Sequence, residues 1–199
     1  MRIVPFLITT AISTALVITL NTRLTIGGNE APAFGSFLSP QHGFWQNAEA
    51  VSESYTADLK FSQLNGKVDV YLDDRLVPHI FAEQENDAYF VQGFLHSKFR
   101  LWQMEFQAYA AAGRLSEILG NKDERILNFD RNMRRLGMVY AAEIALQQMN
   151  NDPVIKSQCD AYTAGVNAYI ETLTESTLPL EYKLIGYKPE KWSNLKSML

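Results

Sequence analysis

Three histidines and one cysteine are the side chains of this sequence best suited to bind a metal ion or to act as a base or nucleophile. His42, His79 and His96 are spaced too widely for a local metal site, and neither an H-E-x-x-H motif nor a second cysteine accompanies them. His79 lies in the extended stretch VPHIFA and is predicted to be a buried, hydrogen-bonded strand residue, whereas His96 is predicted to lie in the core or at its rim. Cys159 lies on the apolar face of a predicted helix, where a structural thiol is expected.

Charged side chains within the aromatic segment 84–112 are a second group with chemical potential. Arg100 and Glu105 lie on a helix that is predicted to be heavily buried, where charges need partners. The candidate partners of Arg100 are Glu105 and Glu117.

A third group lies in the charged connector that follows. Asp130, Arg134 and Arg135 could form an ion-pair cluster, which is usually structural. No G-x-S-x-G motif of the common serine hydrolases occurs in the sequence. We therefore assign no catalytic, cofactor-binding or metal-binding residue to this chain from its sequence.

Two short strands and one long helix must position these side chains. VDVYL (68–72) alternates apolar and polar residues as a half-buried strand does, and VPHIFA (77–82) resumes extended structure after a polar turn. Helix-start residues at 84–87 open a helix that is predicted to end at Gly113. Its apolar residues form two neighbouring stripes, so it must be covered on several sides.

Further helices are predicted over 114–119, over 138–149, and from the capping pair Asp152-Pro153 onward. The sequence stops where another helix begins, and we expect these residues to be the front part of a longer chain. The fold class predicted for this portion is α+β and mostly helical.

Composition is that of an ordinary globular protein, with 47% hydrophobic and 20% charged residues. The net charge of -4, without a basic cluster, argues against nucleic-acid binding. The single cysteine excludes an internal disulfide framework.

The N-terminus predicts export. Arg2 precedes an uncharged apolar stretch from Ile3 to Leu20, which suits either a signal peptide or a membrane anchor. The residues LNTRL that follow are a poor cleavage context, so both possibilities stay open for 1–22. Residues 23–66 are predicted to be a linker whose aromatics Phe44 and Trp45 dock on the folded body.

Six segments between Val68 and Trp192 resemble, in order, the motifs of the penicillin acylase family of N-terminal nucleophile hydrolases. The segments are VPHIFA, DAYFVQGFLHSKFRLWQME, GRLSEILG, FDRNMRRLG, AYTAGVNAYI and LPLEYKLIGYKPEKW. The resemblance assigns 67–199 to the small-chain portion of such a precursor.

This resemblance implies a fold and a mechanism. The strands would join an αββα sandwich with a helical knob, incomplete without a larger chain of the same precursor. That chain would begin with a self-released serine acting on a small-molecule amide, such as an acylated β-lactam or acyl-homoserine lactone. A calcium ion usually clamps the two chains, and its ligands would lie beyond Leu199, so none is assigned here.

The sequence departs from the family pattern at several positions. Leu76 replaces a glycine, which is expected to change the turn, and Phe99 replaces an aspartate. Ala108 and Tyr109 replace an arginine pair, and Lys196 replaces an acidic residue. Such changes fit either altered internal ion pairs or a relative that has lost activity.

Two functional interpretations follow from the sequence. The first is the N-terminal portion of an exported, periplasmic or membrane-anchored amidohydrolase precursor, inactive without its larger chain. The alternative is a membrane-tethered helical binding or scaffold module without catalytic activity.

Overall fold

The computed structural model of the chain describes residues 3–26, 29–48, 54–120 and 123–199. These residues form two compact units, which we describe separately. One contains the described part of 1–54 together with 173–188, and the other contains the described part of 55–172 together with 189–199.

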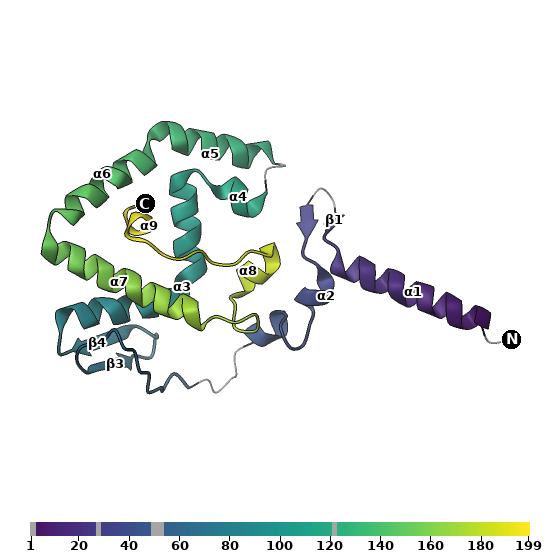
Figure 1. Cartoon of the computed structure of the whole chain (residues 1–199), viewed down its shortest axis with the longest axis horizontal. Coiled ribbons are helices and arrows are strands. Elements are labelled where there is room, and N and C mark those ends of the chain that lie inside the picture. Colours follow the sequence, from purple (N-terminus) through teal and green to yellow (C-terminus); the bar gives the residue numbers. More distant parts are fainter. Residues whose placement is uncertain (1–2, 27–28, 49–53, 121–122) are drawn as a thin grey trace. The chain divides into compact units, whose positions relative to one another are not determined.

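The first unit begins with a long apolar helix, α1 (Ile3–Asn21). A short ribbon of β1 (Leu24–Ile26) and β2 (Asn29–Ala31) follows, with Leu24 opposite Ala31. Then come α2 (Phe34–Phe37), the 3-10 turn η1 (Phe44–Asn47) and, much later in the chain, α8 (Leu180–Ile185). Figure 1 shows α2 beside the C-terminal end of α1.

Lys183 of α8 ties this first unit together. Its Nζ donates to Gly43 O at 3.0 Å, to Asn47 Oδ1 at 2.7 Å and to Ser176 O at 2.9 Å. Burial lowers the pKa of this ammonium group. The segment 43–47 therefore has a fixed place within its unit rather than the free course of a linker.

The two aromatics of this segment contact residues of the same predicted linker, 23–66. Phe44 is half-buried and stacks on Phe37, with ring centroids 5.3 Å apart. Trp45 contacts Phe44 and donates from its indole to Leu38 O, but 57% of its surface stays exposed.

The second unit starts with the predicted hairpin and long helix. Strands β3 (Val68–Leu72) and β4 (Pro78–Ala82) pair antiparallel, with Val70 opposite Ile80. Helix α3 (Glu85–Ala112) ends at Gly113, whose left-handed φ of 63° closes it. The predicted strands and the predicted helix end are thus confirmed.

Five more helices complete the second unit: α4 (Leu115–Leu119), α5 (Glu124–Leu136), α6 (Met138–Asn150), α7 (Pro153–Thr172) and α9 (Asn194–Met198). The Asp152 carboxylate accepts from Val154 N at 2.9 Å, so the predicted cap of α7 is confirmed. Helices α5, α6 and α7 follow one another along an arc, and α9 lies inside it against α3, α6 and α7 (Figure 1).

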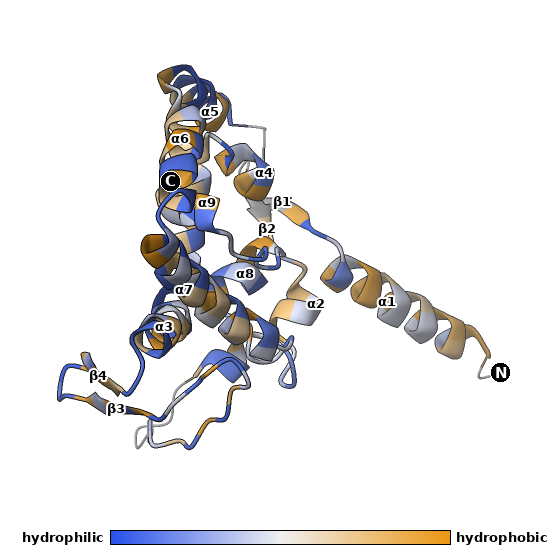
Figure 2. Cartoon of the chain, turned by 60° about the vertical axis from the view of Figure 1, so that its left-hand side comes forward, coloured by the Kyte–Doolittle hydropathy of each residue, from blue (hydrophilic) through white to orange (hydrophobic). Residues whose placement is uncertain are grey.

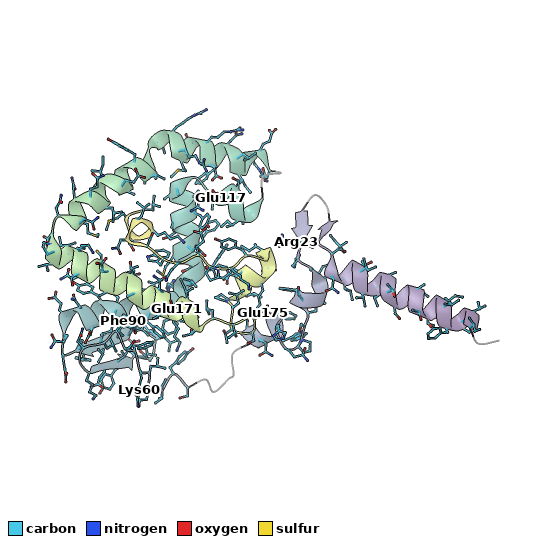
Figure 3. All side chains as sticks on the ribbon, viewed as in Figure 1. Arg23, Lys60, Phe90, Glu117, Glu171 and Glu175 are labelled. Atoms are coloured by element: carbon cyan, nitrogen blue, oxygen red, sulfur yellow. The ribbon has the colours of Figure 1, made fainter. Side chains whose placement is uncertain are left out.

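The core of this unit lies where α3 crosses α7. Phe90 of α3, marked in Figure 3, packs with Phe94 and Ala168, and Phe61 covers Phe90 from the preceding loop. Glycine is required on α7 because a Cβ at Gly165 would lie 1.8 Å from Phe90 O. The backbones therefore approach more closely than side chains would allow.

The described residues are mostly helical with small two-stranded sheets, in line with the predicted α+β class.

Candidate functional site

No arrangement of catalytic type occurs among the described residues. His, Cys, Asp and Glu side chains there do not gather in any group of three or more that could hold a metal ion. The strongest candidates for chemistry are a histidine beside a small pocket and a buried group of charged residues.

His96 lies at the rim of a pocket between β4 and α3. Its Nδ1 lies 3.1 Å from the hydroxyl of Tyr162 on α7. The pocket has a volume of about 350 Å³ and is lined mainly by apolar residues, with Tyr89, Gln92 and His96 as polar members. The predicted rim position is thus confirmed.

Burial governs the ionisation of the His96–Tyr162 pair. Burial, helped by the charge of Arg100, lowers the pKa of His96, and burial raises the pKa of Tyr162. Near neutral pH both groups are therefore uncharged. They form a neutral hydrogen-bonded pair, which can bind a polar ligand group but has no nucleophile to activate.

His79 does not occupy the predicted buried position. Its side chain is 57% exposed and lies 3.8 Å from the Asp73 carboxylate. The prediction was wrong because β3 and β4 pair with no further strand among the described residues, and the outer face of the hairpin, with Tyr71 and Phe81, is exposed.

Cys159 is half-buried on α7, as predicted. Burial and the neighbouring Asp160 carboxylate raise the pKa of its thiol. Because the thiolate is the reactive form, this cysteine is a poor nucleophile.

Glu105 is the centre of the buried charged group. Only 1% of its surface is exposed, and its Oε1 accepts from Glu190 N at 2.9 Å. Lys196 Nζ lies 3.2 Å from the Glu105 carboxylate and 3.1 Å from that of Glu190. The ammonium also lies over the rings of Tyr109 and Trp192.

The second carboxylate of this group, Glu190, is also held by Arg114, whose Nη2 lies 3.3 Å from it. Burial raises the pKa of Glu190, but hydrogen bonds from Tyr109 and Lys196 outweigh that effect and leave it below its usual value. Both carboxylates are thus held by cations, which favours a structural role over proton transfer.

Arg100 pairs with neither of its candidate partners, Glu105 and Glu117. Its Nη1 donates to Gln103 at 3.0 Å on the exposed side of α3. Its own backbone leaves the helical region, with φ -145° and ψ 21°, so α3 is kinked there. Glu117 pairs instead with Arg114, at 2.7 Å.

The contacts of Asp130 also differ from the predicted ion-pair cluster. The buried Asp130 carboxylate accepts from Leu115 N at 2.9 Å and from both the N–H and the hydroxyl of Ser116. Arg134 donates to Gly113 O at 2.8 Å. Asp130 therefore binds the first turn of α4, where unpaired N–H groups need an acceptor.

Two of the departures from the family pattern have definite surroundings. Leu76 has φ 59°, the left-handed conformation that glycine favours. Phe99 contacts Tyr55, with ring centroids 6.1 Å apart.

Sequence reasoning missed two polar residues that fix loops to helices. Asp87 is 1% exposed and accepts from the backbone of Asn65 and Gly66. Asn167 exchanges two hydrogen bonds with the backbone of Trp192. A single polar residue among apolar neighbours, as in AGVNAYI, is the signal that could have identified Asn167.

An exposed aromatic pair marks the outer face of the hairpin. Tyr71 and Phe81 are 63% and 62% exposed, and their rings meet edge to face at 5.9 Å. Each strand has one edge without a partner strand among the described residues. This surface is suited to cover by another polypeptide.

Comparisons with known proteins agree on one family. A family model described as penicillin amidase matches residues 67–199. The penicillin acylase 2 proenzyme of Pseudomonas sp. (strain SE83) is 35% identical over 144 residues, which cover 72% of this chain and 18% of that protein. The acyl-homoserine lactone acylase QuiP of Pseudomonas aeruginosa is 37% identical over 123 residues, covering 62% and 14%. The chain thus spans less than a fifth of these relatives' length.

A solved structure shows the same fold. It is a thermostable penicillin G acylase from Alcaligenes faecalis, with a TM-score of 0.60 and 24% sequence identity. The match covers 66% of this chain and 68% of that one.

Proposed function

Since this chain belongs to the penicillin amidase family, we propose that it is the N-terminal portion of an exported amidohydrolase precursor. The observation that carries the proposal is the match over 67–199, which includes the hairpin, the aromatic helix and the segment with Trp192. One similar protein is named a proenzyme, which supports a precursor.

The proposed substrate is a linear amide of an N-acyl compound. The similar proteins are named for two such compounds, penicillin and acyl-homoserine lactone, and both carry an acyl group on the nitrogen attached to a lactam or lactone ring. We propose hydrolysis of that exocyclic amide, and the proposal covers both the β-lactam amine and the homoserine lactone as the released amine.

The reaction would take place on the larger chain of the precursor. Self-cleavage frees an N-terminal serine, whose hydroxyl attacks the amide carbonyl while its own α-amino group takes the proton. Backbone and asparagine donors stabilise the oxyanion. The amine leaves with the proton, and water then hydrolyses the acyl-enzyme to the free acid.

In this proposal the present chain supports the larger one rather than reacting itself. The exposed face with Tyr71 and Phe81 is the surface we expect the larger chain to cover. The buried Glu105 group holds the segment 190–196 against α3, and so sets the direction in which the chain continues.

Calcium is proposed only for the whole protein. The described residues do not fit a calcium site, because no three of their acidic side chains converge. We place the ligands of the ion outside the described residues, and no step of the proposed reaction uses it.

The test is to express the reading frame continued past Leu199 and to measure intact masses. Two chains, the larger beginning with serine, together with amine release from an N-acyl β-lactam or an N-acyl-homoserine lactone, would support the proposal. The matched control replaces that serine by alanine and should give one uncut chain. A single uncut natural product would contradict the proposal and favour a non-catalytic tethered module.

A further inference from the structure

We infer that α1 is retained as a transmembrane anchor, so that the protein stays attached to the membrane across which it is exported. The inference rests on the export proposed above but not on the hydrolase activity. It is carried by the composition of α1 and by the folded state of the residues that follow it.

Helix α1 has the length and surface of a membrane span. Its 19 residues, Ile3–Asn21, carry no charged side chain and correspond to about 28 Å, close to the roughly 30 Å of a hydrocarbon core. None of them is buried, and large apolar side chains such as Ile3, Phe6 and Ile12 are 72%, 66% and 63% exposed. Figure 2 shows much of the α1 ribbon in the hydrophobic colour, with near-neutral residues between.

Two threonines of α1 bond to the backbone of the helix itself. The hydroxyl of Thr9 donates to Pro5 O at 3.0 Å, and that of Thr19 donates to Ala15 O at 2.9 Å. In lipid no water is present to bind these groups, so such internal bonds allow threonine at membrane depth.

The residues directly after α1 belong to the folded unit. Arg23 Nη2 donates to Ile185 O at 3.2 Å and lies 3.5 Å from Gly186 O, at the C-terminal end of α8 (Figure 3). Asn21 lies against Gly35, where a Cβ would come within 2.8 Å of its Oδ1. Leu24 then pairs with Ala31 in the β1–β2 ribbon.

This folded junction argues for retention. A signal peptidase removes a leader at small residues close after its apolar region. Here Asn21, Thr22 and Arg23 follow the apolar stretch, and two of them contact the folded unit. For cleavage at this junction, the peptidase would have to accept side chains that do not suit it, and the packed segment would have to open.

The unit that contains α1 also carries aromatic residues suited to the membrane interface. Phe37 of α2 stacks on Phe44, and the neighbouring Trp45 is 57% exposed within the same unit. Tryptophan is enriched at the headgroup level, where its ring and its N–H are both solvated. Arg2, before the helix, favours a cytoplasmic N-terminus and an exported body.

The experiment is expression from the native start in an exporting bacterium, followed by carbonate washing of membranes and intact-mass measurement. We expect the natural chain in the membrane fraction with a mass that includes α1. The matched variant N21A/R23A creates the sequence Ala-Thr-Ala at 21–23, which has the small residues that signal peptidase prefers. It also removes the hydrogen bonds from Arg23 to the end of α8. We expect it to be shortened and released into the soluble fraction.

A natural chain that starts after α1 and is recovered in the soluble fraction would overturn the inference. Both measurements report chain length and location rather than amide hydrolysis. A retained α1 in an inactive protein would therefore contradict the hydrolase proposal alone, and a cleaved α1 in an active one would contradict the anchor alone.

Discussion

Glu105 and Lys196 show how a departure at one residue can be balanced by another. The family pattern has an arginine pair after Q-M-E and an acidic residue after the tryptophan, whereas this chain has Ala108, Tyr109 and Lys196. The cation near Glu105 here comes from Lys196, 91 positions along the chain. The substitutions are consistent with altered internal ion pairs, the first of the two explanations that the sequence allowed.

Lys196→Met should strongly destabilise the fold, by about 3 kcal/mol, because it removes the ammonium group that lies 3.2 Å from the nearly inaccessible Glu105 carboxylate. The measurement is the free energy of unfolding in urea. Lys67→Met is the matched control, since the Lys67–Asp69 pair is exposed and should contribute little.

A double variant separates charge from packing. In Glu105→Gln with Lys196→Met the buried carboxylate charge is removed together with the ammonium, so much of the lost stability should return. Equal stability of the double variant and of Lys196→Met would show that the ion pair is not the cause.

Leu76→Gly should stabilise the protein by about 0.5–1 kcal/mol. The left-handed φ of 59° costs a side-chain-bearing residue roughly 1–2 kcal/mol, and the greater freedom of glycine in the unfolded chain offsets part of the gain. Leu76→Ala, which keeps the Cβ, is the control and should show no such gain. A lower urea midpoint for Leu76→Gly would contradict the strain.

At the scale of elements, the junction of α4 and α5 depends on one carboxylate. Burial raises the pKa of Asp130, but the hydrogen bonds from Ser116 and Leu115, with the charge of Arg134, outweigh this and lower it overall. The folded protein thus binds this proton less tightly than the unfolded chain does. The stabilising effect is present at neutral pH and is lost as the pH falls below about 4.

Asp130→Asn should therefore cost about 1–2 kcal/mol at pH 7, because three donors lose a charged acceptor. The difference from the natural chain should shrink between pH 5 and about pH 3, as measured by urea unfolding at each pH. Asp74→Asn, at an exposed turn, is the control. A difference that stays constant with pH would exclude this role.

Local signals explain which elements could be predicted from the sequence. Alternation identified β3, the polar turn after it indicated β4, and Gly113 and Asp152-Pro153 marked a helix end and a helix start. The partners of Glu105 and Asp130 could not be predicted, because they come from segments brought near only by folding. His79 was misplaced because alternation does not reveal which face of a hairpin is covered.

At the scale of the molecule, the exposed hairpin face is the feature most relevant to assembly. Residues 23–199 produced alone should associate, since Tyr71 and Phe81 present apolar surface to solvent. Tyr71→Thr with Phe81→Thr should lower the associated fraction measured by light scattering. Tyr140→Thr, an exposed aromatic on α6, is the control and should have a smaller effect. A monodisperse natural sequence would contradict this prediction.

The distance along the chain between Glu105 and Lys196 also restricts recombination between relatives. A crossover with a relative's gene between codons 109 and 196 would give one of two products. One combines Tyr109 of this chain with the relative's acidic residue at position 196, and the other combines the relative's arginine with Lys196. The first product would put an acidic residue near the Glu105 carboxylate in place of the Lys196 ammonium, and the second would bring two cations to one carboxylate. Chimeric genes that inherit codons 105–196 as one block keep the charges balanced, so this block is the natural unit of exchange for library design.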